Sequence, residues 1–209
     1  MSPSSGTSYH HGNLRAALVE TGFTMARESG PDGVALREVA RRVGVSHNAA
    51  YRHFADREQL LGEIAEQAMD ALTRAMQTRV DAVPHDQGTV ARARARLRET
   101  GRAYVEFALA EPGLFAVAFA SKADAGGADG LGPPTDQGPY GLLNDVLDEL
   151  VDVGYVHPDE RPGSEVVCWA AVHGFAELCL NGPLGAAPAA ARDGALDRLL
   201  VTIDRGLGT

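Results

Sequence analysis

The chain has 209 residues, of which 44% are hydrophobic and 22% are charged, a balance that excludes wholesale disorder. Its formal net charge of −9 argues against a protein that binds nucleic acid over its whole surface. The charge is uneven, however, because residues 1–60 carry seven arginines and only six acidic residues. A negatively charged partner is therefore expected to contact the N-terminal quarter.

After a Ser-rich tail (1–8) that we expect to be flexible, apolar residues at helical spacing predict a helix over Asn13–Glu28. The sequence Gly30-Pro31-Asp32-Gly33 favours a cap and a turn. A two-turn helix is predicted over Leu36–Val43, and Gly44 ends it. The N-terminal region is thus expected to contain short helices joined by tight turns.

Capping residues mark the next two helices. Ser46 is predicted to cap a short helix from His47 to about His53. Asp56, with Gln59 three residues later, forms a capping-box-like pair for a long helix that Pro84 ends.

The remaining sequence also shows helical periodicity, and strand signals are nearly absent. Helices are predicted over 90–110, 113–120, 140–153, 165–180 and 189–207, with a Gly/Pro/Asp-rich loop at 121–138. Two apolar stripes run along 140–153, and 165–180 is apolar on nearly all sides. We expect a second subunit to cover both helices. The arginines of the first of these helices are expected to form a solvated face opposite acidic neighbours; they are Arg92, Arg94, Arg96, Arg98 and Arg102.

The two cysteines, Cys168 and Cys179, lie on one predicted helix, about 16 Å apart at 1.5 Å per residue, and cannot pair with each other. The first residues have neither a basic segment nor an apolar segment typical of a signal peptide. No apolar run approaches the roughly 20 residues of a membrane span. We therefore expect a reduced, cytoplasmic protein that is not bound to a membrane.

The segment Leu36–Phe54 carries the strongest functional signal. Small residues at Ala40, Gly44 and Ala50 fit a helix-turn-helix, because Ala40 lets the helices cross closely and Gly44 can adopt the left-handed conformation of the turn. In such a unit the second helix enters the major groove with its N-terminal residues at the base edges. By itself, this spacing also fits an ordinary helical hairpin.

A longer pattern favours the DNA-binding interpretation. Ala40–Leu61 fills every listed position of A-x-x-x-G-V-S-x-x-x-x-Y-x-H-F-x-[DK]-[KR]-x-x-L-L and resembles the N-terminal domain of TetR-type transcriptional regulators. Tyr9–Arg15 and Trp169–Ala176 resemble the branch of that family with a "WHG" C-terminal domain. Two positions depart from the pattern, because Ala35 stands where a Ser or Thr cap is common and Ala50 where this branch often has Pro.

The resemblance implies an all-α protein with a homeodomain-like helix-turn-helix domain at 9–57 and a larger helical bundle at 58–209 for ligand binding and dimerisation. It implies a homodimeric repressor that a small apolar or aromatic effector releases from a palindromic double-stranded DNA operator. Dimerisation is expected through 140–153 and 165–180. No cofactor, metal or catalytic residue is expected. The operator, the effector and the sign of regulation are not specified by the sequence.

The resemblance also implies individual DNA contacts. Arg37 matches a position that reaches the backbone or a guanine edge, and the expected base-reading residues are His47, Asn48 and Ala49. The expected phosphate contacts are Ser46, Tyr51, His53 and Arg57. Tyr51 could instead be a packing aromatic, His53 could be a half-buried cap, and Tyr9–His11 could be either a DNA-contacting arm or a disordered tail.

The expected effector pocket is aromatic and is lined by Tyr104, Phe107, Phe115, Phe119, Trp169 and His173. These residues could equally be core packing. His173 and Glu177, four residues apart, could bind a metal, but no metalloprotease motif accompanies them. A helical-bundle enzyme or metal-binding protein is the alternative, and a structural module without DNA binding is a third possibility. The lack of a phosphate loop and of paired Glu-x-x-His motifs argues against an enzyme.

Overall fold

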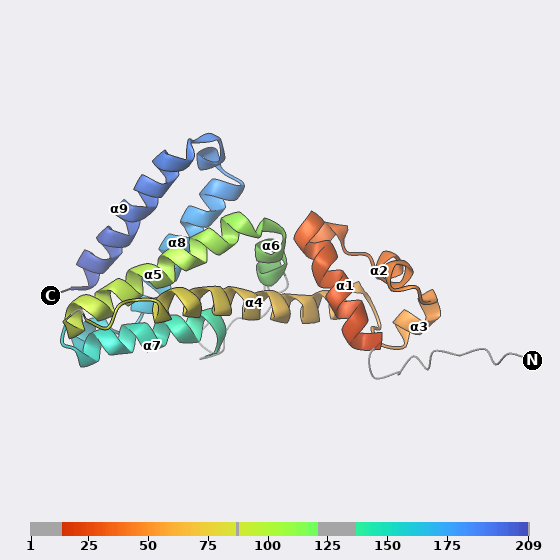
Figure 1. Ribbon diagram of the computed structural model, residues 1–209, viewed down its shortest axis with the longest axis horizontal. Coiled ribbons are helices and arrows are strands. Elements are labelled where there is room, and N and C mark those ends of the chain that lie inside the picture. The colour runs from red at the N-terminus through yellow and green to blue at the C-terminus, as the bar shows by residue number, and fades with distance from the viewer. Residues whose placement is uncertain (1–13, 87, 121–136, 209) are drawn as a thin grey trace, which may run out of the picture.

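The computed structural model describes residues 14–86, 88–120 and 137–208, and within them the chain is helical and has no strand (Figure 1). The α-helices are α1 (Leu14–Ser29), α2 (Leu36–Val43), α3 (His47–Tyr51), α4 (Arg57–Asp81), α5 (Thr89–Ala110), α6 (Pro112–Ala120), α7 (Gly138–Asp152), α8 (Ser164–Leu180) and α9 (Ala189–Leu207). Short 3₁₀ turns lie at Pro31–Gly33, Pro158–Glu160 and Pro183–Ala186. This architecture confirms the all-α prediction and the predicted order of helices. The predicted tail at 1–8 and most of the loop at 121–138 lie outside the described residues.

The turn between α2 and α3 forms as the sequence predicts. Gly44 has φ 80°, in the left-handed region that favours glycine. The Ser46 hydroxyl accepts a hydrogen bond from the amide of Ala49 at 3.2 Å and caps α3. Ala35 begins α2 without a side-chain cap, as expected from its methyl group. The local signals therefore determine the geometry of the helix-turn-helix.

The third helix ends earlier than predicted, at Tyr51 rather than at His53. The amides of His53 and Phe54 both donate to the carbonyl oxygen of Ala50, which tightens the final turn. Phe54 is fully buried, so the chain must turn toward the core at this point. Asp56 then accepts from the amide of Gln59 at 2.8 Å and starts α4 as predicted.

Two hydrophobic cores lie along α4, the long helix that runs between the two ends of the molecule in Figure 1. The N-terminal core joins α1, α2, α3 and the first half of α4. The second core joins the remainder of α4 to α5, α7, α8 and α9. The short helix α6 contributes to both, because Leu114 and Val117 are buried in the N-terminal core and Phe115 is buried in the second.

The start of α6 lies directly against the end of α1. A Cβ atom on Gly113 would overlap the carbonyl oxygen of Ala26 and lie 2.8 Å from that of Arg27, so a side chain cannot be added without moving one helix. Arg27 also forms an ion pair with Glu111 at 2.9 Å. These contacts connect the N-terminal helices to the aromatic residues of α6.

The expectation that α7 needs a second subunit to cover its apolar stripes is wrong. Leu142, Val146 and Leu150 are buried, as are Leu143 and Leu147, because α7 packs against α4, α5 and α8. Helix α8 behaves differently and leaves apolar side chains on its surface. Val167 is 62% exposed and Leu178 is 46% exposed.

The arginines of α5 are also not a solvated face. Arg94 and Arg98 both bond to the carboxylate of Asp204 on α9, which is only 2% exposed. Arg96 pairs with Glu149 of α7. The expected acidic neighbours are present. They belong to α7 and α9, which pack against α5, so these arginine side chains form ion pairs between helices.

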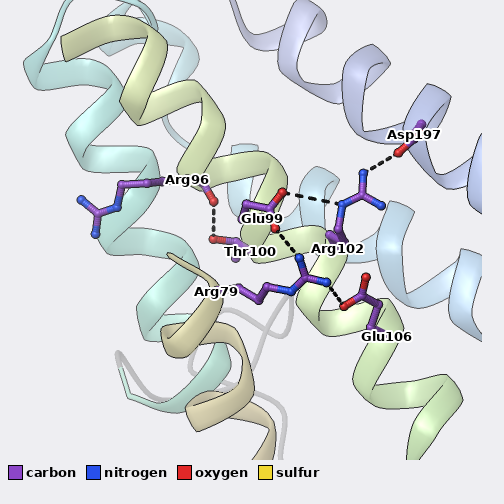
Figure 2. Close-up of polar contacts among 7 residues, drawn as sticks. All are labelled: Arg79, Arg96, Glu99, Thr100, Arg102, Glu106 and Asp197. Atoms are coloured by element: carbon purple, nitrogen blue, oxygen red, sulfur yellow. Dashed lines mark hydrogen bonds and ion pairs between the residues drawn. The ribbon is translucent and has the colours of Figure 1, made fainter. Parts of the chain in front are cut away.

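Further ion pairs join α4, α5 and α9 (Figure 2). Arg79 of α4 lies between Glu99 and Glu106 of α5, and Arg102 of α5 pairs with Glu99 and with Asp197 of α9. Figure 2 shows Arg96 pointing away from this group, on the other side of α5.

Both cysteines are buried and unpaired, as the sequence predicts. Burial raises the pKa of the Cys168 thiol to about 11. Among the described helices, none is by itself long and apolar enough to cross a membrane; α5 and α6 pass that test only when taken together, although they meet at an angle of 106°.

Candidate functional site

The predicted base-reading residues lie at the free end of the molecule, on α3, far from α7 and α9 (Figure 1). Asn48 is exposed, and Ala49 is half-buried beside it. Ala50 is fully buried and packs the helix onto the N-terminal core. The helix therefore presents a polar side chain outward within its first turn, where the amide groups of the N-terminus also point.

Arg37, His47 and Tyr51 form one cluster across α2 and α3. The Arg37 Nε donates a hydrogen bond to the His47 Nε2 at 3.1 Å. The rings of His47 and Tyr51 lie 4.2 Å apart between centroids. Tyr51 is nevertheless 43% exposed, so it packs on its neighbour and is still accessible to solvent.

His53 lies just beyond α3 and is half-buried. Its carbonyl oxygen accepts a hydrogen bond from Arg15 Nη1 at 2.7 Å, and the Arg15 guanidinium lies 4.6 Å from the Phe54 ring centroid. Arg15 also pairs with Glu63 of α4. This arrangement fixes the backbone at His53 through its carbonyl oxygen.

Arg57 has a structural role that the sequence does not predict. Its Nε donates to the carbonyl oxygen of Val34 at 2.8 Å, and its Nη2 donates to that of Pro31 at 2.6 Å. Its Nη1 pairs with Glu58 at 2.9 Å. Arg57, which was expected to contact a phosphate, therefore connects the turn before α2 to the start of α4 through hydrogen bonds.

The arginines at the end of α2 are held by acidic neighbours. Arg41 and Arg42 both bond to Glu38, and Arg42 also reaches Glu28 at 3.1 Å. The hydrogen bond from Arg41 lowers the pKa of Glu38 to about 2. Both arginines are exposed, so this face of α2 is solvated.

The second predicted site is an aromatic cluster between α5, α6 and α8. It brings together Tyr104, Phe115, Phe119, Trp169 and His173, which lie in successive ring contacts with centroids 4.8–6.5 Å apart. Phe107 makes no ring contact with them among the described residues; it is half-buried and packs against both cores. Tyr140 was not predicted, yet its ring lies 6.1 Å from that of Trp169. It is the aromatic residue of α7, and local spacing gave no signal that α7 would reach this cluster.

Three polar atoms lie inside this aromatic shell. The Trp169 indole N–H donates to the Tyr104 hydroxyl oxygen at 3.2 Å, and that oxygen lies 2.7 Å from His173 Nδ1. An indole N–H can only donate, so the Tyr104 oxygen accepts from Trp169. The Tyr104 hydroxyl proton is then donated to His173. Nδ1 of His173 then accepts, and its Nε2 carries the ring proton.

Burial keeps these groups uncharged. It raises the pKa of Tyr104 well above its usual value and lowers the pKa of His173, although the charge of Glu177 acts in the opposite direction on the histidine. Glu177 is the potential metal-binding partner of His173, but the described residues contain no group of three His, Cys, Asp or Glu side chains that could hold a metal ion. The cluster is thus an apolar site with neutral hydrogen-bonding groups.

Two family models match the chain. One, described as "Bacterial regulatory proteins, tetR family", matches residues 18–64, and the other, described as "Tetracyclin repressor-like, C-terminal domain", matches residues 97–203. Among curated proteins, the HTH-type transcriptional repressor Rv3405c of Mycobacterium tuberculosis is 30% identical over 69 residues, 33% of this chain and 37% of that protein. An uncharacterized HTH-type transcriptional regulator of Haemophilus influenzae is 36% identical over 72 residues, 32% of this chain and 35% of that protein. The chain therefore matches only about a third of the length of these curated relatives.

Solved structures resemble the chain over nearly its full length. A protein of unknown function from Rhodococcus sp. RHA1 is 32% identical with a TM-score of 0.77, covering 98% of this chain and 100% of that one. A TetR-family transcriptional regulator from Pectobacterium atrosepticum is 21% identical with a TM-score of 0.67 and covers 98% of each chain. RolR in complex with resorcinol is 18% identical with a TM-score of 0.64, covering 95% of this chain and 89% of that one. The last two likenesses concern the fold alone.

Proposed function

The chain belongs to the TetR family of DNA-binding transcriptional regulators, and from this premise we propose a homodimeric repressor that releases a palindromic operator when a small apolar or aromatic effector binds. The observation that carries the proposal is the exposed first turn of α3, with Asn48 pointing outward and Arg37 and His47 beside it. Asn can bond an adenine edge with two hydrogen bonds, and Ala49 can contact a thymine methyl group. Ser46, Tyr51 and His53 are proposed to contact phosphates.

Selection of binding sites from random duplex DNA at low salt tests the DNA-binding part. We expect one enriched sequence. Because the chain is acidic overall, its binding to DNA must come from local contacts with phosphates, and its affinity should therefore fall steeply as the salt concentration rises. Asn48→Ala should reduce discrimination at particular base pairs by about 1–3 kcal/mol and leave folding unchanged. Failure to enrich any sequence would refute the proposal.

For the dimer we propose that α8 of one subunit packs against a second copy of the chain. The exposed Val167 and Leu178 are eleven residues apart and lie on the same side of α8. On the neighbouring α9, Val201 is 37% exposed. A second copy is the favoured occupant because a two-fold axis through this face would pair two DNA-binding ends, and it predicts half-sites about 34 Å apart or a larger spacing.

The proposed effector site is the aromatic cluster. Its rings favour a planar, largely apolar molecule, and the neutral Tyr104 and His173 offer hydrogen bonds without charge. RolR, whose fold resembles that of this chain, was solved with resorcinol, a small aromatic molecule of this type. This likeness supports the chemical class of the proposed effector.

Two helices offer a route from this site to DNA. The long helix α4 begins at Arg57, next to α3, and α6 has Phe115 in the aromatic cluster and Gly113 against the end of α1. An effector that moves α6 would thus move α1 directly, in addition to any shift of α4. A difference of about 1–3 kcal/mol between two dimer arrangements would lower DNA affinity about 5–150-fold.

A His173→Ala variant tests the effector site by three measurements: folding stability, operator affinity, and loss of affinity on adding a small aromatic compound that binds the parent protein. We expect a folded variant that binds DNA normally and ignores the compound. A folded variant that responds as fully as the parent would place the effector elsewhere.

A further inference from the structure

The hydrogen bonds inside the aromatic cluster leave one donor unused. The Tyr104 hydroxyl accepts from Trp169 and donates to His173 Nδ1, so the three side chains form one chain of hydrogen bonds. A neutral imidazole that accepts at Nδ1 has its proton at Nε2. Within the residues that the structure describes, His173 Nε2 has no hydrogen-bond partner. The free donor of the cluster is therefore the Nε2–H of His173.

His173 lies in the accessible part of the cluster. Tyr104 and Phe115 are buried, with 3% and 1% of their surfaces exposed, whereas Phe119, Trp169 and His173 are only partly buried. The centroid of the His173 ring lies 4.9 Å from that of Phe119 and 5.8 Å from that of Trp169. A planar molecule that packs against these rings therefore comes within reach of the imidazole.

The charge that acts on the cluster is negative. Glu177 lies one turn after His173 on α8, and its charge raises the pKa of both Tyr104 and His173. Its carboxylate accepts a hydrogen bond from the side-chain amide of Asn181 at 2.8 Å, so it is turned toward the end of α8. The negative potential of Glu177 opposes the binding of an anion beside His173.

We propose that the effector is a neutral aromatic carbonyl compound, an aryl ketone or aldehyde, whose oxygen accepts the Nε2–H of His173, and that Tyr104 is a positioning residue that keeps this proton on Nε2. The inference rests on the proposed effector site and adds the chemical group that the site selects. A carbonyl oxygen accepts a hydrogen bond and brings no proton that needs an acceptor in return. A purely apolar ring would displace water from the N–H and leave it unpaired. A carboxylate would meet the negative potential of Glu177 without a cation to balance it.

The test measures the binding of four compounds of similar shape to the full chain by isothermal titration calorimetry. Acetophenone presents a carbonyl oxygen, and α-methylstyrene has a methylene group in place of that oxygen. Benzoate presents a carboxylate at the same position, and α-methylbenzyl alcohol presents a hydroxyl group. We expect acetophenone to bind roughly tenfold more tightly than α-methylstyrene, because only the ketone pairs with the N–H. The alcohol should bind less tightly than the ketone, and benzoate should bind most weakly.

Three variants test the roles of the side chains through the ratio of the affinities for acetophenone and α-methylstyrene. His173→Gln, whose amide can accept from Tyr104 and donate to the ligand, should keep the preference for the ketone. Tyr104→Phe should reduce this preference, because His173 loses the bond that keeps its proton on Nε2. Tyr155→Phe is the matched control, since its hydroxyl bonds a carbonyl oxygen of α9 at 2.9 Å outside the cluster, and it should keep the parental ratio. NMR spectra of the imidazole nitrogens of the parent should show the proton of His173 on Nε2.

Equal affinities of the parent for acetophenone and α-methylstyrene would overturn the inference, as would tighter binding of benzoate or of the alcohol. A proton on Nδ1 of His173, or a folded Tyr104→Phe variant with the full parental ratio, would overturn the positioning role of Tyr104. If none of the four compounds binds the parent, the proposed effector site in the aromatic cluster itself fails, and this inference fails with it.

Discussion

The hydroxyl oxygen of Tyr104 lies 2.7 Å from Nδ1 of His173 and connects α5 to α8 through residues 69 positions apart. The same oxygen accepts the indole N–H of Trp169. A single buried hydroxyl thus satisfies two polar side chains inside an aromatic shell, which makes it a sensitive point for both stability and ligand binding.

Replacing this hydroxyl should destabilise the protein. Tyr104→Phe keeps the ring but leaves Trp169 and His173 without their shared partner, at a cost of about 1–3 kcal/mol in the free energy of unfolding. Urea denaturation of parent and variant measures the difference. Tyr51→Phe, at an exposed tyrosine, is the matched control and should change stability by less than about 0.5 kcal/mol. An unchanged midpoint for Tyr104→Phe would show that the hydrogen bonds contribute little.

His173 should make stability depend on pH. Burial lowers the pKa of His173 in the folded state. In the unfolded chain the pKa of histidine is about 6.5, so the unfolded chain binds the proton more readily. The contribution of neutral His173 is therefore full above that pH and is lost as the pH falls toward the lower folded-state pKa. His173→Gln accepts the same hydrogen bond without titrating and should lose less stability on acidification. Identical pH profiles of parent and variant would contradict this assignment.

Arg57 should contribute to the folding stability of the N-terminal domain, independently of any contact with DNA. Arg57→Ala removes hydrogen bonds to the carbonyl oxygens of Val34 and Pro31, and we expect a loss of about 1–3 kcal/mol in the stability of the N-terminal domain. Arg57→Lys should recover only part of the lost stability, because an ammonium lacks the planar set of donors with which the guanidinium bonds both carbonyl oxygens. Denaturation is followed together with DNA affinity. Full stability combined with uniformly weakened DNA binding would restore the phosphate role predicted from the sequence.

The dimer face can be tested by charge insertion. Val167→Glu places a carboxylate in the exposed apolar surface of α8 and should yield a folded monomer by sedimentation at micromolar concentration. Asp145→Arg on the exposed side of α7 is the matched control and should remain dimeric. A dimer that survives Val167→Glu but dissociates with Asp145→Arg would place the interface on α7.

Gly113→Ala tests the contact between α6 and α1. The added methyl group overlaps the carbonyl oxygens of Ala26 and Arg27, so α1 or α6 must shift, at a cost of about 1–3 kcal/mol. If α6 transmits the effector signal, this variant should also bind the operator more weakly without any effector. Gly62→Ala, at a position on α4 with no neighbouring atom close to the added carbon, is the control and should bind DNA normally. Parent-like affinity in Gly113→Ala would leave α4 as the route.

The sequence by itself determined the features that depend on neighbours along the chain. Gly44 ends α2, Ser46 starts α3 and Asp56 starts α4, because a left-handed turn or a cap needs only residues within one helical turn. The periodicity that predicted α5 to α9 is local in the same sense. The aromatic residues of α6 and α8 could be grouped from sequence, whereas Tyr140 of α7, which reaches Trp169 in the structure, could not.

Tertiary structure alone decided which groups each long side chain meets. Arg57 looked like a phosphate contact, but the turn at Val34 lies close enough to take its donors. The apolar stripes of α7 looked like an interface, yet α4, α5 and α8 cover them within one subunit. Arg37 and His47 are ten residues apart, and only the crossing of α2 and α3 brings them to 3.1 Å. A helix pattern specifies which face is apolar, whereas the partner of that face, and of each charge beside it, depends on how helices distant in sequence cross.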